Sequence, residues 1–159
     1  MRVLVFSDSH GRNDTMKRAI EAAGPVDQVI HLGDIEGGED ALRRMTSAPC
    51  AIVAGNNDYY SKLPEKLILR LNGHKVLCVH GHRQRIYFGL EVLSYEAEEA
   101  GCDLVLFGPI HRPVDAFIGR VRIVNPGSIS LPRQADRRKS YALIELEDDG
   151  LIKVTHHYV

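Results

Sequence analysis

The chain lacks the features that mark membrane proteins, secreted proteins and strongly charged binding proteins. Its 159 residues contain no tryptophan, and no apolar run approaches the roughly 20 residues that a membrane-spanning helix needs. The N-terminal segment has neither the long apolar region nor the small-residue cleavage site of a signal peptide. Twenty basic and 21 acidic side chains give a formal net charge of −1, which excludes a highly basic nucleic-acid coat. We therefore expect a cytoplasmic protein that does not bind membranes.

Cysteine is also scarce, and its positions exclude two kinds of site. Cys50, Cys78 and Cys102 are odd in number, lie beside aliphatic residues and form no CxxC pair. This pattern predicts reduced, buried thiols, and the spacing is too wide for a zinc site made of thiolates. The remaining composition, 44% hydrophobic and 26% charged, is that of a globular protein. The length fits a single domain over residues 1–159.

Hydrophobic periodicity predicts both strands and helices. Short runs rich in Val, Ile and Leu predict buried strands at Arg2–Phe6, Gln28–Leu32, Cys50–Val53, Lys75–His80, Leu104–Phe107 and Val121–Val124. Helical spacing predicts helices at Asn13–Ala23, Glu39–Met45 and Leu90–Ala100. Turns at Asn72-Gly73, Gly119 and Asp149-Gly150 predict three hairpins, with strands at Leu67–Leu71 and Lys75–Val79, Phe117–Ile118 and Arg120–Val124, and Tyr141–Leu146 and Leu151–His157. The βαβαβ order followed by hairpins predicts a layered α/β sandwich of two sheets with outer helices.

Polar side chains follow the strands at the points where ligands collect in α/β proteins. The segments concerned are Asp8-Ser9-His10, Gly33-Asp34, Gly55-Asn56-Asn57-Asp58, His80-Gly81-His82 and Gly108-Pro109-Ile110-His111. An isolated Asp or Asn after a strand is usually a turn residue, but five such segments together indicate a metal site. The mixture of carboxylate, amide and imidazole ligands suits Mn²⁺, Fe²⁺ or Zn²⁺ better than Ca²⁺.

The order of these segments resembles the calcineurin-like metallophosphoesterases. Their signature is DxH, then GD, then GNH followed by an acid, then a lone His, then GHxH, and the five segments match it in sequence. The start SDSHG and the turn Asn125-Pro126-Gly127-Ser128 are similar to the small YfcE-type bacterial phosphodiesterases. The resemblance runs from residue 2 to about residue 130. It implies a four-layer αββα sandwich of two mixed β-sheets flanked by helices.

The resemblance also implies a site with two divalent metal ions, Mn²⁺ foremost and Zn, Fe or Ni as alternatives. Metal one would take Asp8, His10, Asp34 and His111. Metal two would share Asp34 and take Asn56, His80 and the first His of GHxH. A hydroxide held by the metals would attack phosphorus, so the catalytic set would be Asp34, Asn56, His80 and Asn57.

Two residues depart from the family pattern. Pro109 stands in place of the first His of GHxH and cannot bind a metal, so metal two should be weaker, with His82 or water as the substitute. Asn57 stands where the family often has a His that can protonate the leaving group. An amide cannot act as a general acid near pH 7, so substrates with good leaving groups should be favoured.

Residues around the motifs suggest substrate contacts and supporting roles. Arg12, Arg83, Arg112 and Arg133 could each bind a phosphate by paired hydrogen bonds. Arg112, next to His111, is the favoured substrate-binding residue, together with Asn57. Asp58 could orient Asn57 or His10, or it could cap a turn. His31 is expected to be a hydrogen-bonded imidazole behind the ligands.

The favoured function is a metal-dependent phosphoesterase, and specifically a phosphodiesterase. The alternative is a weakened binding scaffold, because the same fold includes a retromer subunit with a damaged metal site. A metal-free nucleotide-binding module is disfavoured because no GxxxxGK loop is present. The expected partner is a phosphoester substrate, with nucleic acid only as a substrate. Hairpin edges favour a homodimer or higher homo-oligomer.

Overall fold

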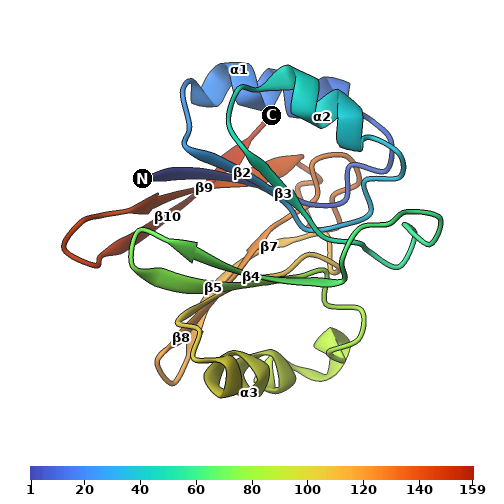
Figure 1. Cartoon of the computed structure of the whole chain (residues 1–159). Helices are drawn as coiled ribbons and strands as arrows, with labels where there is room; N and C mark the ends of the chain where they lie inside the picture. Colours follow the sequence, from blue (N-terminus) through green and yellow to red (C-terminus); the bar gives the residue numbers. More distant parts are fainter.

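Two five-stranded mixed sheets pack face to face in the computed structural model, which describes residues 1–159 (Figure 1). The first sheet has the order β10-β9-β1-β2-β3, and the second has the order β4-β5-β6-β8-β7. Helices α1 and α2 cover the outer face of the first sheet, and α3 covers the outer face of the second. The predicted four-layer αββα sandwich is therefore confirmed.

The observed boundaries agree closely with the predicted ones. The strands are β1 (Arg2–Phe6), β2 (Gln28–His31), β3 (Cys50–Ile52), β4 (Lys66–Leu71), β5 (His74–Val79), β6 (Leu104–Leu106), β7 (Pro113–Ile118), β8 (Val121–Pro126), β9 (Ser140–Leu146) and β10 (Ile152–Tyr158). The helices are α1 (Asp14–Ala23), α2 (Glu39–Met45), the short 3₁₀ turn η1 (Ile86–Phe88) and α3 (Glu91–Ala100). None of these helices is long and apolar enough to cross a membrane.

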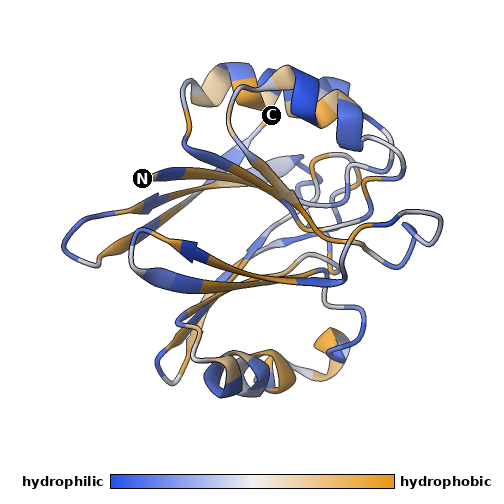
Figure 2. Cartoon of the chain, viewed as in Figure 1, coloured by the Kyte–Doolittle hydropathy of each residue, from blue (hydrophilic) through white to orange (hydrophobic).

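The apolar runs became strands because both of their faces are buried. In β1, Val3 and Val5 face the second sheet, whereas Leu4 and Phe6 pack under α1 and α2. Successive side chains of a strand point to opposite faces, so a strand between two apolar layers needs apolar residues at every position. Figure 2 shows this as strands that are largely orange in the two middle layers.

The β4–β5 hairpin has the turn that its sequence predicts. The β7–β8 hairpin is longer than predicted. Asn72 and Gly73 have φ angles of 47° and 84°, as a two-residue hairpin turn requires. Strand β7 begins at Pro113 rather than Phe117, because it pairs with β8 over its whole length, from Pro113 opposite Pro126. Pro113 is tolerated because β7 is an edge strand. His111 therefore lies just before a strand.

The three cysteines are free, as expected from their number and spacing. Cys78 and Cys102 are buried, and Cys50 is half-buried. Burial raises the pKa of the Cys78 thiol to about 12. A thiol with this pKa is inert at neutral pH, so the buried cysteines act as small apolar core residues.

Candidate metal centre

Four predicted ligands meet at one end of the sandwich. The ligand atoms of Asp8, His10, Asp34 and His111 all lie within 4.8 Å of one another. Asp8 and His10 follow β1, Asp34 follows β2 and His111 precedes β7, so both sheets contribute. The three residues other than His10 are buried. These are the four residues predicted for metal one.

Hydrogen bonds hold each imidazole with its Nε2 atom toward the carboxylates. His80 Nδ1 donates to the carbonyl oxygen of Leu32 at 2.7 Å, and His111 Nδ1 donates to that of Leu131 at 2.9 Å. Because a carbonyl only accepts, the Nδ1 atoms carry the protons and the Nε2 lone pairs remain free. His111 Nε2 lies 3.0 Å from Asp8 Oδ1, and His80 Nε2 lies 3.5 Å from Asp34 Oδ2. Such an arrangement orients imidazoles as metal ligands.

His10 is held by a residue that sequence reasoning missed. Its Nδ1 atom lies 2.5 Å from the Oε2 atom of Glu36. Glu36 follows the Gly33-Asp34 motif by two residues and belongs to no recognised motif. Only the hydrogen bond reveals its role, which is to turn His10 Nε2 toward the other ligands.

Three ligand atoms are buried without any hydrogen-bond partner. They are Asp8 Oδ1, His10 Nε2 and His80 Nε2. A buried polar atom without a partner costs about 1–3 kcal/mol, and such atoms rarely occur in one place without a reason. All three are electron-pair donors, so a divalent cation satisfies them together. The residues present therefore fit a metal ion.

The backbone at the ligands is in an unusual conformation. Asp8, His10, Asp34 and His111 have φ angles of 57°, 49°, 56° and 56°. The left-handed region is uncommon for residues other than glycine and costs about 1–2 kcal/mol at each. Strained backbone of this kind persists at functional sites because the surrounding contacts enforce it.

Asp58 enforces this conformation in the loop after β2. Its carboxylate accepts from the backbone N–H groups of Asp34 at 2.7 Å, Glu36 at 2.8 Å and Gly55 at 2.8 Å. The sequence had suggested that Asp58 orients Asn57 or His10, or caps a turn. The bond to Gly55 agrees with the turn cap, whereas the side chains of Asn57 and His10 hydrogen-bond to Asp34 and Glu36 rather than to Asp58. Asp58 instead ties the β2 loop to the β3 loop, because four backbone N–H groups, including that of Ile35 at 3.4 Å, converge on one carboxylate.

The Asn125-Pro126-Gly127-Ser128 turn does the same for the loop after β1. The Ser128 and Ser130 hydroxyls both donate to the carbonyl oxygen of Asp8, at 3.0 and 2.7 Å. Ser128 Oγ also accepts from the N–H of Leu131, whose carbonyl holds His111. This motif therefore positions two ligands at once without being a ligand itself.

Two glycines allow the β2 and β3 loops to approach closely. A Cβ atom on Gly55 would lie 2.2 Å from Asp34 Oδ1, and one on Gly33 would lie 2.6 Å from the nitrogen of Gly55. No side chain fits at either position. Lack of space therefore explains both glycines, and Gly33 also has a φ of 104°, which favours glycine.

Two of the residues predicted for metal two, Asp34 and Asn56, border an open cavity, whereas His80 is buried and does not line it. This cavity of about 420 Å³ is lined by His10, Asp34, Asn56, Asn57, His82, Tyr87, Pro109, His111 and Arg133. Asn57 donates from its backbone N–H and its Nδ2 atom to the two oxygens of Asp34, at 2.9 and 3.0 Å. Its side chain therefore orients the carboxylate predicted to be shared.

Pro109 and His82 stand beside one another on the wall of the cavity. A Cβ atom on Gly81 would lie 3.0 Å from Pro109 Cδ, so the proline ring packs on the His80–His82 loop. The rings of His80 and His82 have centroids 5.5 Å apart. Partial desolvation, followed by repulsion from His80, lowers the pKa of His82 and favours its neutral form.

His31 lies behind the ligands, as expected. It is fully buried, its Nε2 atom lies 2.9 Å from the Ser9 hydroxyl, and its Nδ1 atom accepts from the N–H of Gly33. Burial, reinforced by His80, lowers the pKa of His31 to about 3. The imidazole is therefore neutral and supports the backbone of both ligand loops.

The four arginines fall in different places. Arg133 lines the metal-site cavity, and none of the ion pairs of the protein includes it. Arg112 instead lines a neighbouring, mostly apolar cavity. Arg83 is paired with Glu65 at 2.7 Å, and Arg12 is exposed outside the cavity.

Known proteins share both the sequence and the fold. The model of the calcineurin-like phosphoesterase superfamily domain matches residues 1–149. The probable metallophosphoesterase YsnB of Bacillus subtilis is 37% identical over 151 residues, covering 94% of this chain and 87% of that protein. The vacuolar protein sorting-associated protein 29 of Schizosaccharomyces pombe is 30% identical over 135 residues, with coverage of 80% and 72%.

A solved structure agrees with these matches. A conserved protein of Streptococcus pneumoniae, described as a predicted phosphoesterase, superposes with a TM-score of 0.81 at 32% identity, covering 98% of this chain and 97% of that one. The ordered ligands, the αββα layers and the family match over most of the chain agree with one another. The chain belongs to the calcineurin-like phosphoesterase superfamily.

Proposed function

We propose that the protein is a metal-dependent phosphodiesterase with a dinuclear site. Metal one is held by Asp8, His10, Asp34 and His111, and metal two by Asp34, Asn56 and His80. The observation that carries this proposal is the set of three buried, unpartnered donor atoms on Asp8, His10 and His80. Divalent ions bound there would stabilise charge on the phosphoryl oxygens and make hydroxide available near neutral pH.

The residues around the metals have separate tasks in this proposal. Asn57 keeps both oxygens of Asp34 in place through its two hydrogen bonds. Arg133, rather than Arg112, binds the phosphoryl group, because it borders the cavity and has no carboxylate partner. A guanidinium can donate two parallel hydrogen bonds to phosphate oxygens.

The residue at position 57 bears on which esters the proposed phosphodiesterase should hydrolyse fastest. No histidine stands at position 57, so the leaving group would depart without a general acid from that position. Esters of acidic alcohols or phenols should therefore react fastest.

Further assignments form part of the same proposal. Mn²⁺ is the favoured ion, and Zn, Fe or Ni are alternatives for this mixed oxygen and nitrogen donor set. We also propose a cytoplasmic location, in keeping with the free thiols, and a single domain over residues 1–159. We also propose that the protein forms a homodimer or higher homo-oligomer through its exposed edge strands.

Hydrolysis of a bis-aryl phosphodiester and an aryl phosphomonoester tests the proposal. Mn²⁺ should support diester hydrolysis and a chelator should abolish it. Asp34→Asn should lower the rate at least about a hundredfold, because it weakens the ligand shared by both metals. The exposed carboxylate Asp40 on α2 provides the matched control, Asp40→Asn, which should keep full activity.

The second candidate is a binding scaffold of the same fold. Pro109 favours it, because the residue removes one ligand of metal two, and the relative from Schizosaccharomyces pombe is a vacuolar protein sorting-associated protein. Folded protein that hydrolyses no phosphoester with any divalent metal would favour the scaffold. Six ligand residues in place favour the enzyme.

A further inference from the structure

The metal-site cavity has one apolar wall that the chemistry of phosphoryl transfer does not require. Apart from Tyr87 and Pro109, its lining residues are all polar or charged. The Tyr87 side chain is 73% exposed, and its hydroxyl lies 3.5 Å from the carbonyl oxygen of Pro109, at the outer limit of a hydrogen bond. Because Tyr87 is largely exposed and lines the cavity, its ring is accessible to a ligand bound there.

The turn that carries Tyr87 is firmly anchored. The 3₁₀ turn η1 places Ile86 in the core beneath α3, where it is only 6% exposed. Phe88 and Gly89 donate backbone hydrogen bonds to Arg85 and Ile86, at 2.9 and 3.1 Å. The backbone of the neighbouring Tyr87 is therefore held at the rim of the cavity by a buried residue.

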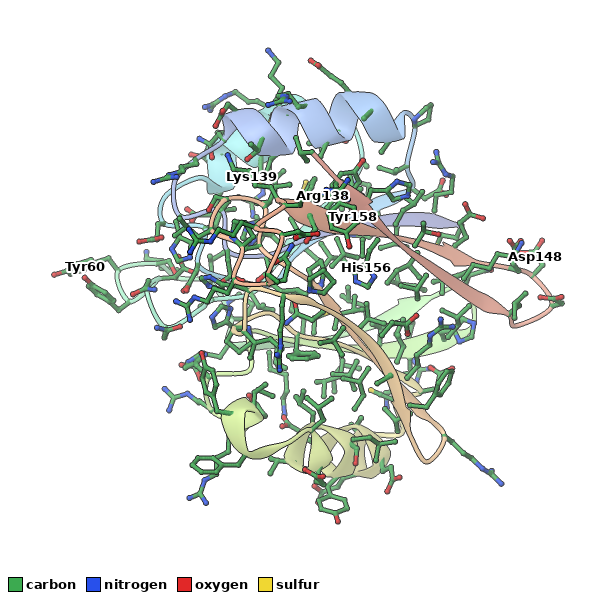
Figure 3. All side chains as sticks on the ribbon, turned by 180° about the vertical axis from the view of Figure 1, so that it is seen from behind. Tyr60, Arg138, Lys139, Asp148, His156 and Tyr158 are labelled. Atoms are coloured by element: carbon green, nitrogen blue, oxygen red, sulfur yellow. The ribbon has the colours of Figure 1, made fainter.

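A second group of exposed aromatic residues, Tyr59 and Tyr60, lies in a region of opposite charge. Tyr59 and Tyr60 have ring centroids 4.6 Å apart, and Tyr60 projects from the body of the molecule (Figure 3). Their cavity is bordered by Glu36, Glu39 and Asp58. Three carboxylates disfavour an anionic ester, whereas the Tyr87 cavity contains Arg133 and the predicted metal ligands.

Building on the proposed function, we propose that the substrate is a nucleoside-containing phosphodiester whose base stacks on Tyr87 beside Pro109. The phosphoryl group lies at the metal ligands and Arg133, and the ring of Tyr87 lies at the rim of the same cavity. The ligands, Arg133 and Tyr87 line one cavity of about 420 Å³, which has the size of small-molecule sites and so can hold phosphate, sugar and base together. Stacking on an aromatic side chain accepts any base, so the preference is for the class rather than for one nucleobase.

Calorimetry with three probes in saturating Mn²⁺ tests this inference without measuring turnover. The probes are adenosine 5′-monophosphate, ribose 5-phosphate, which lacks only the base, and inorganic phosphate. Stacking of one base is worth about 1–3 kcal/mol, so the nucleotide should bind at least about fivefold more tightly than the sugar phosphate. Tyr87→Ala should abolish this difference, and Tyr87→Phe should preserve it because the ring remains.

Tyr95→Ala is the matched control. Tyr95 is a 66% exposed tyrosine on α3 and does not line the cavity, so its loss should leave the ratio unchanged. An equal affinity for nucleotide and sugar phosphate, or a ratio that survives Tyr87→Ala, would overturn the inference while the phosphoryl site stands. Butyl phosphate is a further control compound: if it also bound at least about fivefold more tightly than ribose 5-phosphate, the wall would be merely apolar and the inference would be overturned. If none of the three probes bound, both the proposed function and this inference would be contradicted.

Discussion

Pro109 causes the two predicted metal positions to differ in their number of protein ligands. Proline offers no donor atom, so metal two retains Asp34, Asn56 and His80, and Asn56 supplies only a neutral carbonyl oxygen. Metal one has two carboxylates and two imidazoles within 4.8 Å of one another. Each carboxylate adds charge attraction that an amide lacks, so the first ion should bind more tightly than the second.

Restoring the missing imidazole should tighten the second position. Pro109→His is expected to lower the dissociation constant of the second ion about tenfold or more, which corresponds to about 1.4 kcal/mol. The variant should then reach its full activity at a lower free metal concentration than the unaltered protein. Titration calorimetry with elemental analysis measures both steps. Two equally tight ions in the unaltered protein would instead show that His82 or a bound anion already completes the site.

The buried imidazole of His31 should make stability depend on pH. Its pKa is about 3 in the folded protein, below the ordinary value of 6.5, so the unfolded chain binds a proton that the folded chain refuses. Stability should therefore be unaffected by His31 above about pH 6.5 and should fall as pH drops toward 3, by at most about 1.4 kcal/mol per pH unit.

Urea unfolding in chelator between pH 7.5 and 5 measures this decline. His31→Gln should be less stable at pH 7.5 but should lose stability less steeply below pH 6.5. The half-buried His157, which stacks on Tyr141 in the first sheet, supplies the control His157→Gln. Parallel curves for the parent chain and His31→Gln would contradict the assignment.

At the scale of elements, the site depends on loops that hold one another. The β2 loop is tied to the β3 loop through Asp58, and the β1 loop is tied to the segment after β8 through Ser128 and Ser130. Parallel strands bring these loops to one edge, and the hydrogen bonds between loops then fix the left-handed backbone of the ligands.

Removing the Asp58 carboxylate should therefore damage both stability and metal binding. Asp58→Ala leaves several buried N–H groups without an acceptor and should cost about 3 kcal/mol or more in the free energy of unfolding. In the folded fraction, metal affinity should fall about 10–100-fold, although Asp58 is not a ligand. Chemical denaturation and metal titration measure the two effects.

Asp149 provides a matched control for this experiment. Its carboxylate also accepts a backbone N–H, from Leu151 at 3.0 Å, but it lies in the exposed β9–β10 turn. This turn carries Asp148, which Figure 3 shows on the opposite side from Tyr60. Asp149→Ala should cost about 0.5 kcal/mol or less. Unchanged metal affinity in Asp58→Ala would show that the ligand loops keep their shape without it.

At the scale of the whole molecule, the predicted metal ligands come from both sheets. Asp8, His10 and Asp34 belong to loops of the first sheet, whereas His80 and His111 belong to loops of the second. A bound ion therefore links two halves that otherwise meet through an apolar interface, seen between the two middle layers in Figure 2.

Metal should accordingly stabilise the whole fold. At a hundredfold excess over its dissociation constant, a ligand of the native state adds about 2.7 kcal/mol, which raises Tm by about 5–10 °C in a chain of this size. Hydrogen exchange should slow in the loops of both sheets. Calorimetry with Mn²⁺ and with chelator tests this, and protection limited to one sheet would argue against shared ligation.

The sequence by itself determined the features that depend on neighbouring residues. Apolar runs such as Arg2–Phe6 predicted the strands, Asn72-Gly73 predicted a hairpin, and the ordered motifs predicted four residues whose ligand atoms lie within 4.8 Å of one another. These features could be predicted because alternation, turn geometry and ligand type act over a few residues, or recur in a fixed order within a family.

Only the tertiary structure decided which distant groups meet. It placed Arg133 rather than Arg112 in the cavity, turned Asp58 toward backbone N–H groups, paired Glu36 with His10 and set Tyr87 beside Pro109. No local pattern encodes these contacts, because each joins segments from different loops. Their geometry follows from how the two sheets pack and which edge their strand ends share.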